Sequence, residues 1–199
     1  MRWLLVSLLI LCGAAVITSR FVPKINQLDV VGNVHHDRAG ILRLAGLAEG
    51  DPFLWVTDRN LRRLARDPWI GSATIVRVWP ERVSITIDER RATLTDGLTS
   101  YADDGTVLPG ATAAETAALP RLTGWGAPRT AEAIELMRLL RTYQPQVISY
   151  SPEGFEIQLS SGSLFTPSVE ALREQWSAFV SHRGGRIAVY PWGVSTANE

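Results

Sequence analysis

Residues 67–90 read DPWIGSATIVRVWPERVSITIDER, and this stretch decides the fold of the first half of the chain. A β-branched and aromatic run over residues 72–79 is followed by a Pro-Glu turn. Residues 82–89 then alternate strictly between apolar and polar side chains, with valine and isoleucine on one side. Such alternation is typical of a strand with one buried and one solvated face. The stretch therefore predicts a β-hairpin.

The segment before the hairpin predicts one further strand and two helices. Residues 25–31 form a short strand that Gly32 ends. Apolar side chains recur at helical spacing over residues 41–45, and again over residues 61–65 behind a Thr57-Asp58 cap. The predicted order is strand, helix, helix, strand, strand. Two helices on one face of a three-stranded sheet bury the apolar sides of all five elements.

This order of motifs resembles a known family. The opening LDVVGN (residues 28–33) is similar to the first strand of a POTRA domain. The pattern PWI…A…V.R.WP…V.I.I.ER over residues 68–90 resembles the bacterial division protein family FtsQ, called DivIB in Gram-positive relatives. YADDGTV (residues 101–107) and LPRLTG (119–124) resemble signatures of that family's β-domain. The resemblance implies a POTRA domain over residues 24–91 and an FtsQ-type β-domain over residues 92–199.

The second half of the chain predicts a mixed sheet with two helices, so that the fold class of the whole is α+β. A hairpin is expected around Asp103-Asp104-Gly105. The helices are expected over residues 130–143 and 168–182, and the other strands over residues 146–151, 155–159 and 186–190. IAVYPWG (187–193) resembles the family's terminal strand and turn, although Ala188 replaces the usual Asp and one residue is missing.

Residues 1–23 predict a short N-terminus and a transmembrane anchor. WLLVSLLILCGAAVITS (residues 3–19) contains no charged side chain and lies between Arg2 and Arg20. At 1.5 Å per residue this run spans about 25 Å, and residues 21–22 extend it toward the roughly 30 Å of a bilayer core. The alternative is a cleaved signal peptide with Gly13-x-Ala15 as the cleavage site. We expect a single-pass anchor in the cytoplasmic membrane, with the folded part outside the cytoplasm.

Composition and motifs argue against nucleic-acid binding, a metal site and enzymatic activity. Lysine plus arginine equals aspartate plus glutamate at 20 each, a balance that disfavours nucleic-acid binding. Cys12 is the single cysteine, which excludes an intrachain disulfide and a thiolate metal site. His35-His36-Asp37 is interpreted as a polar loop, because a third ligand at metal-binding spacing is missing. We therefore predict a protein that is not an enzyme, with no catalytic residue, metal, cofactor or small-molecule substrate.

Seven tryptophans stand out in this chain. Four of them lie within apolar patterns and are predicted to belong to the core, namely Trp55, Trp69, Trp79 and Trp176.

The predicted function is that of a scaffold. A sheet that ends in an unpaired strand offers backbone donors and acceptors to a partner, and residues 186–190 are the expected edge. Arg186, Val189, Tyr190 and Trp192 are the predicted contacts; the alternative is that Val189 and Tyr190 only pack on the neighbouring helix. The resemblance implies a divisome scaffold at the septum that links early and late division proteins, with FtsB and FtsL as partners. The rival functions are a POTRA-bearing transport or secretion component and an exported cell-wall enzyme.

Overall fold

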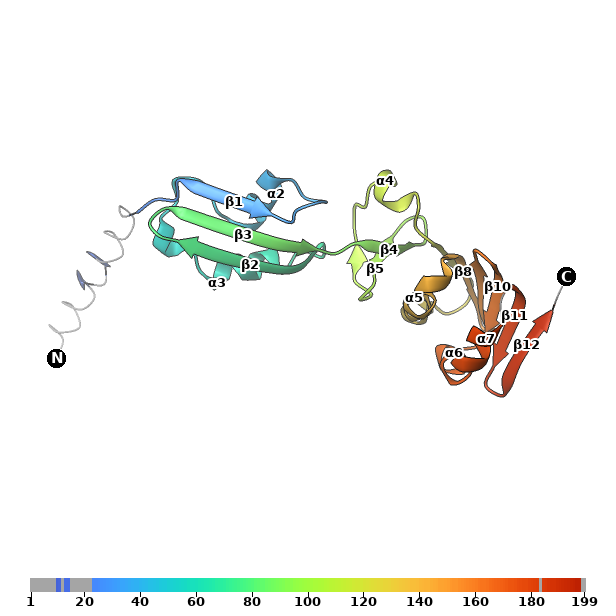
Figure 1. Cartoon of the computed structure of the whole chain (residues 1–199). Coiled ribbons are helices and arrows are strands. Elements are labelled where there is room, and N and C mark those ends of the chain that lie inside the picture. Colours follow the sequence, from blue (N-terminus) through green and yellow to red (C-terminus); the bar gives the residue numbers. More distant parts are fainter. Residues whose placement is uncertain (1–9, 12, 15–22, 183, 198–199) are drawn as a thin grey trace. The chain divides into compact units, whose positions relative to one another are not determined.

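The computed structural model describes residues 10–11, 13–14, 23–182 and 184–197. They belong to two compact units that divide between Arg90 and Arg91 (Figure 1). The predicted anchor, residues 3–19, falls mostly outside the described residues. In the described part of the chain, no helix has the length and apolar character needed to cross a membrane.

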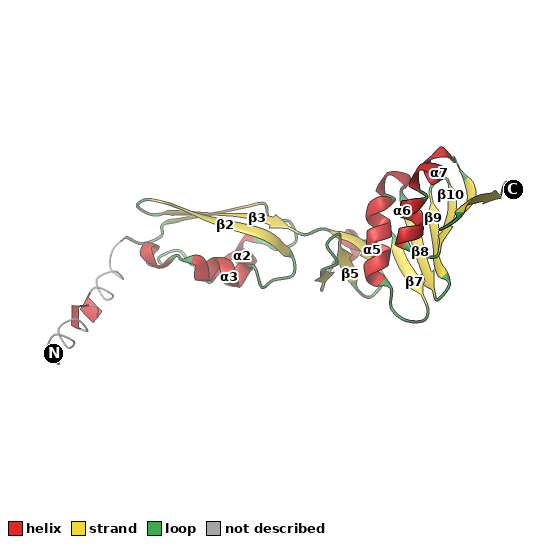
Figure 2. Ribbon diagram, turned by 90° about the horizontal axis from the view of Figure 1, so that it is seen from below, coloured by secondary structure: helices red, strands yellow, loops and turns green. Residues whose placement is uncertain are grey.

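The first unit has the predicted order of strand, helix, helix, strand, strand. Its elements are β1 (Gln27–Val31), α2 (Arg38–Ala45), the 3₁₀ turn η1 (Phe53–Trp55), α3 (Asp58–Leu64), β2 (Ile70–Val78) and β3 (Arg82–Glu89). The sheet order is β1-β3-β2, with β1 parallel and β2 antiparallel to β3. Both α-helices lie on the same face of the sheet (Figure 2). The α+β class is thereby confirmed for this unit.

Short-range signals begin and end the two helices of the first unit. The Asp37 carboxylate accepts the Gly40 N–H at 2.7 Å and caps α2, which Gly46 ends in the left-handed region at φ 65°. Thr57 caps α3 in a capping box with Asn60. The buried Asn60 amide also donates to the Ala45 carbonyl at 2.9 Å, which ties the end of α2 to the start of α3.

The core of the first unit is built on the middle strand. Val83, Ile85 and Ile87 of β3 are buried, as the alternation predicts. They pack with apolar side chains from β1, α2, η1 and α3, including Leu28, Ile41, Phe53 and Leu64. The helices cover this one face, so the polar residues of β3 point to the other.

The second unit contains a nine-stranded mixed sheet. Its elements are β4 (Ala92–Thr95), β5 (Ser100–Ala102), β6 (Val107–Leu108), α4 (Ala113–Thr116), β7 (Arg121–Gly124), α5 (Thr130–Leu139), the 3₁₀ turn η2 (Arg141–Tyr143), β8 (Pro145–Ser151), β9 (Gly154–Leu159), β10 (Gly162–Thr166), α6 (Val169–Glu174), α7 (Trp176–Ser181), β11 (Gly185–Tyr190) and β12 (Gly193–Ala197). The strand order is β12-β11-β10-β9-β8-β7-β4-β5-β6. Helices α5, α6 and α7 lie on the same face of this sheet (Figure 2).

Some elements of the second unit differ from the prediction. The expected helix over residues 168–182 is two short helices that meet at Gln175. Strands β4, β7, β10 and β12 are additional, as is the short helix α4. Gly162 of β10 faces Gly185 of β11, and a Cβ atom on Gly162 would lie 2.1 Å from the Gly185 carbonyl oxygen. The close approach of these strands therefore requires glycine, a residue that in sequence reads as a turn signal.

A single arginine joins three segments of the second unit. Arg129 precedes α5 and makes two bonds to Glu132, with its Nη2 atom 2.6 Å from Oε2. It also donates to the carbonyls of Ser151 and Pro167, and its guanidinium lies 4.1 Å from the centre of the Phe155 ring. The start of α5 is thus fixed to the ends of β8 and β10 by contacts between residues 22 and 38 positions apart.

Candidate partner-binding edge

Strand β11 is an interior strand, so the prediction that residues 186–190 form the open edge is wrong. β11 pairs with β10 in parallel on one side and with β12 in antiparallel orientation on the other. The physical reason lies in the turn at Pro191 and Trp192, which reverses the chain and lets residues 193–197 pair back onto β11. The Gln175 side chain donates to the Pro191 carbonyl at 2.8 Å and holds this turn.

The open edge of the sheet belongs to β12. Among the residues that the structure describes, β12 pairs with β11 and with no other strand. Its last three residues, Ser195 to Ala197, are exposed. The opposite edge is β6, which has two residues. β12 is therefore the longer free margin of the sheet, with its outward N–H and C=O groups available to another chain.

An aromatic strip lies beside this edge, formed by Phe165 of β10, Tyr190 of β11 and Trp192 in the turn. The Phe165 and Tyr190 ring centres are 5.7 Å apart, and Tyr190 stacks on Trp192 at 5.1 Å with 9° between the ring planes. Neighbouring positions Leu164 and Val189 point into the helix-covered core. Because side chains alternate along a strand, Phe165 and Tyr190 point to the helix-free face. Trp192 is 82% exposed.

The four predicted contact residues fall into different environments. Arg186 is exposed and lies opposite Ala197 in the β11–β12 register. Tyr190 and Trp192 are part of the aromatic strip. Val189 is fully buried in the core, where it packs among apolar side chains. Arg186, Tyr190 and Trp192 thus remain available for contact, whereas the position of Val189 agrees with the alternative that it packs in the fold.

Sequence reasoning did not find β12 or Phe165. The segment GVSTA after Trp192 contains a valine and a threonine, but it is too short for a clear alternation. A Pro-Trp-Gly turn followed by strand-forming residues is the signal that was available for a terminal hairpin. Phe165 follows the Ser-Gly-rich residues 160–163, which mask the strand that carries it.

The histidine pair has structural roles. The His35 ring stacks on Trp69, with centres 3.6 Å apart. His36 Nε2 lies 3.2 Å from the Asp67 carboxylate. Asp37 caps α2, so its carboxylate faces backbone N–H groups. In the described residues, no group of three or more His, Cys, Asp or Glu side chains is arranged to hold a metal ion.

The four tryptophans predicted for the core divide evenly. Trp69 is buried and Trp176 packs against the core of the second unit. Trp55 and Trp79 are 46% and 66% exposed, so the prediction is wrong for them. The Trp79 ring packs edge-on against Phe53, with 5.8 Å between the ring centres, and still remains largely exposed. Both residues lie at the end of the unit where the chain enters β1, Trp55 in η1 and Trp79 in the turn between β2 and β3.

Comparison with known proteins agrees with this architecture. Residues 24–90 match the model of the POTRA domain, FtsQ-type. The chain is therefore a POTRA-domain protein with a second α+β unit behind that domain. It is similar to the cell division protein FtsQ of Bradyrhizobium diazoefficiens, with 29% identity over 63% of this chain and 37% of the relative. The cell division protein FtsQ of Geobacter sp. is 32% identical over 43% of this chain and 32% of that relative.

These matches support the FtsQ/DivIB family for this chain: its POTRA domain is of the FtsQ type, and three relatives are named FtsQ. The match to the FtsQ protein of Koribacter versatilis, at 30% identity, covers 33% of this chain and 19% of the relative. The matched segments thus span between 19% and 37% of the length of these curated relatives.

Proposed function

We propose that this protein is a non-enzymatic scaffold of the bacterial division machinery that binds a partner strand along β12. The relatives are named cell division proteins, and the observation that carries the proposal is the one-sided pairing of β12. The partners are proteins of the FtsB and FtsL type, which the family resemblance implies. The scaffold would be held by a single-pass anchor in the cytoplasmic membrane, work outside the cytoplasm at the septum, and link early and late division proteins.

The binding step is β-strand addition. In an antiparallel strand, alternate residues direct both backbone groups to the same side, so five residues offer about two or three outward-facing sets. Each backbone hydrogen bond contributes only a net ~0.5–1.5 kcal/mol to the binding free energy, because it replaces hydrogen bonds that both strands made with water. The backbone alone therefore gives modest affinity and little selectivity.

Selectivity would come from the aromatic strip. Trp192 is the most exposed of its three rings and adjoins the first residue of β12. A partner strand paired to β12 could lay apolar side chains over Tyr190 and Trp192 on the helix-free face. Truncation of a buried interface tryptophan commonly costs about 2 kcal/mol or more. Arg186, near the other end of the β11–β12 hairpin, would select a partner with an acidic residue there.

Cysteine crosslinking of the full chain in cell membranes tests the mode of binding. In a Cys12→Ser background, single cysteines at positions 194 to 197 are paired with one cysteine in the FtsB-type partner. Strand addition predicts a yield that alternates along β12, about threefold between adjacent positions, because side chains alternate between faces. A cysteine at Val107 on β6 is the control for the opposite edge. A yield without alternation, or strongest at Val107, would contradict strand addition at β12.

Substitution of the exposed side chains tests the contacts. Arg186→Glu and Tyr190→Glu should each reduce capture of the FtsB-type partner about tenfold or more, because they reverse a charge or place a carboxylate in the aromatic strip. Val107→Glu is the matched control at β6 and should leave capture unchanged. A fluorescent fusion of the wild-type chain should form a ring at midcell. A uniform envelope signal would count against a division role and favour a transport or secretion component.

A further inference from the structure

The end of the POTRA domain where the chain enters carries an exposed apolar surface next to a basic groove. The Phe53 N–H donates to the Pro23 carbonyl at 2.9 Å, and Lys24 forms a β-bridge with Pro52. The N–H of Asn26 donates to the carbonyl of Glu81 in the β2–β3 turn at 3.0 Å. Chain entry, η1 and the β2–β3 turn are therefore neighbours. We call this part of the domain the entry end.

Three large apolar side chains at the entry end face solvent. Leu54 is 48% exposed, and Trp55 and Trp79 are the two tryptophans that the sequence analysis assigned wrongly to the core. Tryptophan is the side chain that favours the boundary between hydrocarbon and headgroups, because its ring is large and apolar while its N–H remains polar. Exposed apolar side chains gathered in one place mark an interaction surface rather than random surface exposure.

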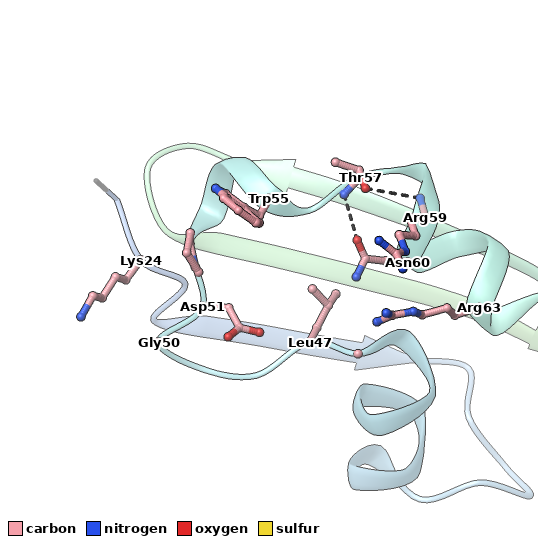
Figure 3. Close-up of a pocket in the computed structure, with 11 residues that line it drawn as sticks. Lys24, Leu47, Gly50, Asp51, Trp55, Thr57, Arg59, Asn60 and Arg63 are labelled. Carbon is pink, nitrogen blue, oxygen red and sulfur yellow. Dashed lines mark hydrogen bonds between the residues drawn. The ribbon is translucent and has the colours of Figure 1, made fainter. Parts of the chain in front are cut away.

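The groove beside these side chains has an excess of positive charge. Its volume is about 620 Å³, and its lining includes Lys24, Arg59, Arg63 and a single carboxylate, Asp51. Figure 3 shows Arg59 and Arg63 on the α3 side of the groove, with Lys24 and Trp55 at its other end. The Asp51 carboxylate accepts the Ala48 N–H at 2.8 Å. In the described part of the chain, none of the three cations forms an ion pair.

We infer that the entry end is a membrane-contact surface, which lays Leu54, Trp55 and Trp79 against the bilayer and binds anionic lipid headgroups with Lys24, Arg59 and Arg63. This inference rests on the proposed anchor. The apolar run ends at Ser19, five residues before Lys24, and extended chain spans about 3.5 Å per residue. An anchored chain therefore holds the entry end within about 18 Å of the membrane. This tether lets the entry end approach the bilayer to within the Debye length of about 8 Å, where cations are attracted to anionic headgroups and exposed tryptophans enter the interface.

Fluorescence quenching in lipid nanodiscs tests the contact with the full-length chain. In a Cys12→Ser background, a fluorophore is attached to a single cysteine at Leu54 or at Val34, and the discs contain lipids with a quencher on the headgroup. Val34 is 80% exposed and its N–H bonds to Glu89, the last residue of β3, so it lies at the opposite end of a strand of eight residues, about 26 Å away. Quenching at Leu54 should be about threefold stronger than at Val34.

Lipid composition and charge variants test the groove. Replacing phosphatidylglycerol by phosphatidylcholine should remove about half of the extra quenching at Leu54, and Arg59→Gln with Arg63→Gln should have the same effect in anionic discs. Arg38→Gln with Arg43→Gln removes equal charge outside the groove lining and should have no effect. Equal quenching at Leu54 and Val34 would overturn the inference. Protection of the Leu54 label that arises only when a protein partner is added would also overturn it.

The same discs separate this inference from the proposed function. Weak quenching at Leu54 together with alternating crosslinks along β12 contradicts the membrane contact alone. Loss of the chain from the discs under an alkaline wash contradicts the anchor and, with it, the membrane contact.

Discussion

Strand β3, the middle strand of the first sheet, and β9, an interior strand of the second, are alike, but helix α5 of the second unit is positioned in a different way from α2 and α3. Val83, Ile85 and Ile87 of β3 and Phe155, Ile157 and Leu159 of β9 show the same alternation of buried and exposed positions. In the POTRA domain, α2 and α3 are capped by their own neighbours Asp37 and Thr57. In the second unit, α5 has no side-chain cap and is held by Arg129 through distant carbonyls. The comparison teaches that equal burial can be reached by short-range or by long-range contacts.

Core truncation should test whether β3 and β9 are equivalent. Phe155→Ala should lower the free energy of unfolding of the second unit by about 3–5 kcal/mol, because it leaves a cavity below the Arg129 guanidinium. Ile85→Ala in β3 should cost the POTRA domain about 2–5 kcal/mol. Denaturant unfolding followed by hydrogen exchange assigns each loss to its unit. A loss below about 1 kcal/mol at either position would show that its strand is not central to the core.

Removal of the long-range contacts should affect the second unit next most strongly. Arg129→Met keeps the aliphatic part of the side chain and removes its bonds to Glu132, Ser151 and Pro167, with an expected loss of about 2–3 kcal/mol. Arg138→Met is the matched control, because exposed Arg138 donates, among the residues that the structure describes, to the Asp103 carbonyl alone, and its loss should cost less than about 0.5 kcal/mol. The measurement is urea unfolding of both variants. Equal losses would contradict the assigned role of Arg129.

Removal of an N-cap should lower the stability of a unit only where the capped helix contributes side chains to the core. Thr57 and Thr112 both form capping boxes, but α3 buries Asn60 and Leu64 whereas α4 buries none of its residues. Thr57→Ala should cost about 1 kcal/mol of POTRA stability. Thr112→Ala should change the stability of the second unit by less than about 0.3 kcal/mol, because α4 can fray without opening the core. Thermal unfolding of the two variants is the test, and a larger effect at Thr112 would reverse the comparison.

The ion pair at the start of α5 should make the second unit slightly sensitive to acid. Hydrogen bonding to Arg129 holds the pKa of Glu132 below its ordinary value. The unfolded state therefore binds a proton at higher pH than the folded state does. The stabilising effect is complete above about pH 5 and is lost as the pH falls through about 4.3 toward the lower folded-state pKa. The Glu132 side chain is 38% exposed, so solvent screening should limit the effect to less than about 1 kcal/mol.

Glu132→Gln should flatten the stability of the second unit between pH 5 and about pH 3 relative to the wild type. Glu135→Gln serves as a neighbouring control on the same helix, since Glu135 pairs with Arg173 on the protein surface. The test is to measure the unfolding midpoints of the wild type and both variants across this pH range. An unchanged pH profile in Glu132→Gln would remove Glu132 as the source of the acid sensitivity.

The POTRA half of the chain was largely predictable because its signals are short-range. Strand β3 has the predicted bounds, and α2 begins and ends at residues with the expected capping preference. The tryptophans at positions 55 and 79 were misassigned because an apolar pattern indicates a preference for burial, while the available cover depends on where the helices end. The same misassigned residues lie on the surface that we infer to contact the membrane.

The second unit was less predictable, and its edge was predicted on the wrong strand. Tyr190 and Trp192 were selected from the sequence and lie together in the aromatic strip, whereas Val189 is part of the core. Phe165 joins the strip through the pairing of β10 with β11, segments separated by two helices. The alternation of side chains along a strand can be read locally, but the neighbours of that strand cannot.

The amino-acid order alone indicated the elements of the POTRA domain, the apolar faces of β3 and β9 and the resemblance to the FtsQ family, because these depend on residues a few positions apart or on motifs along the chain. Pairing between distant segments settled which strand is left open. Five residues after Trp192 turn back onto β11 and move the free margin to β12, and backbone hydrogen bonding between strands carries almost no signature in the residue types that form it.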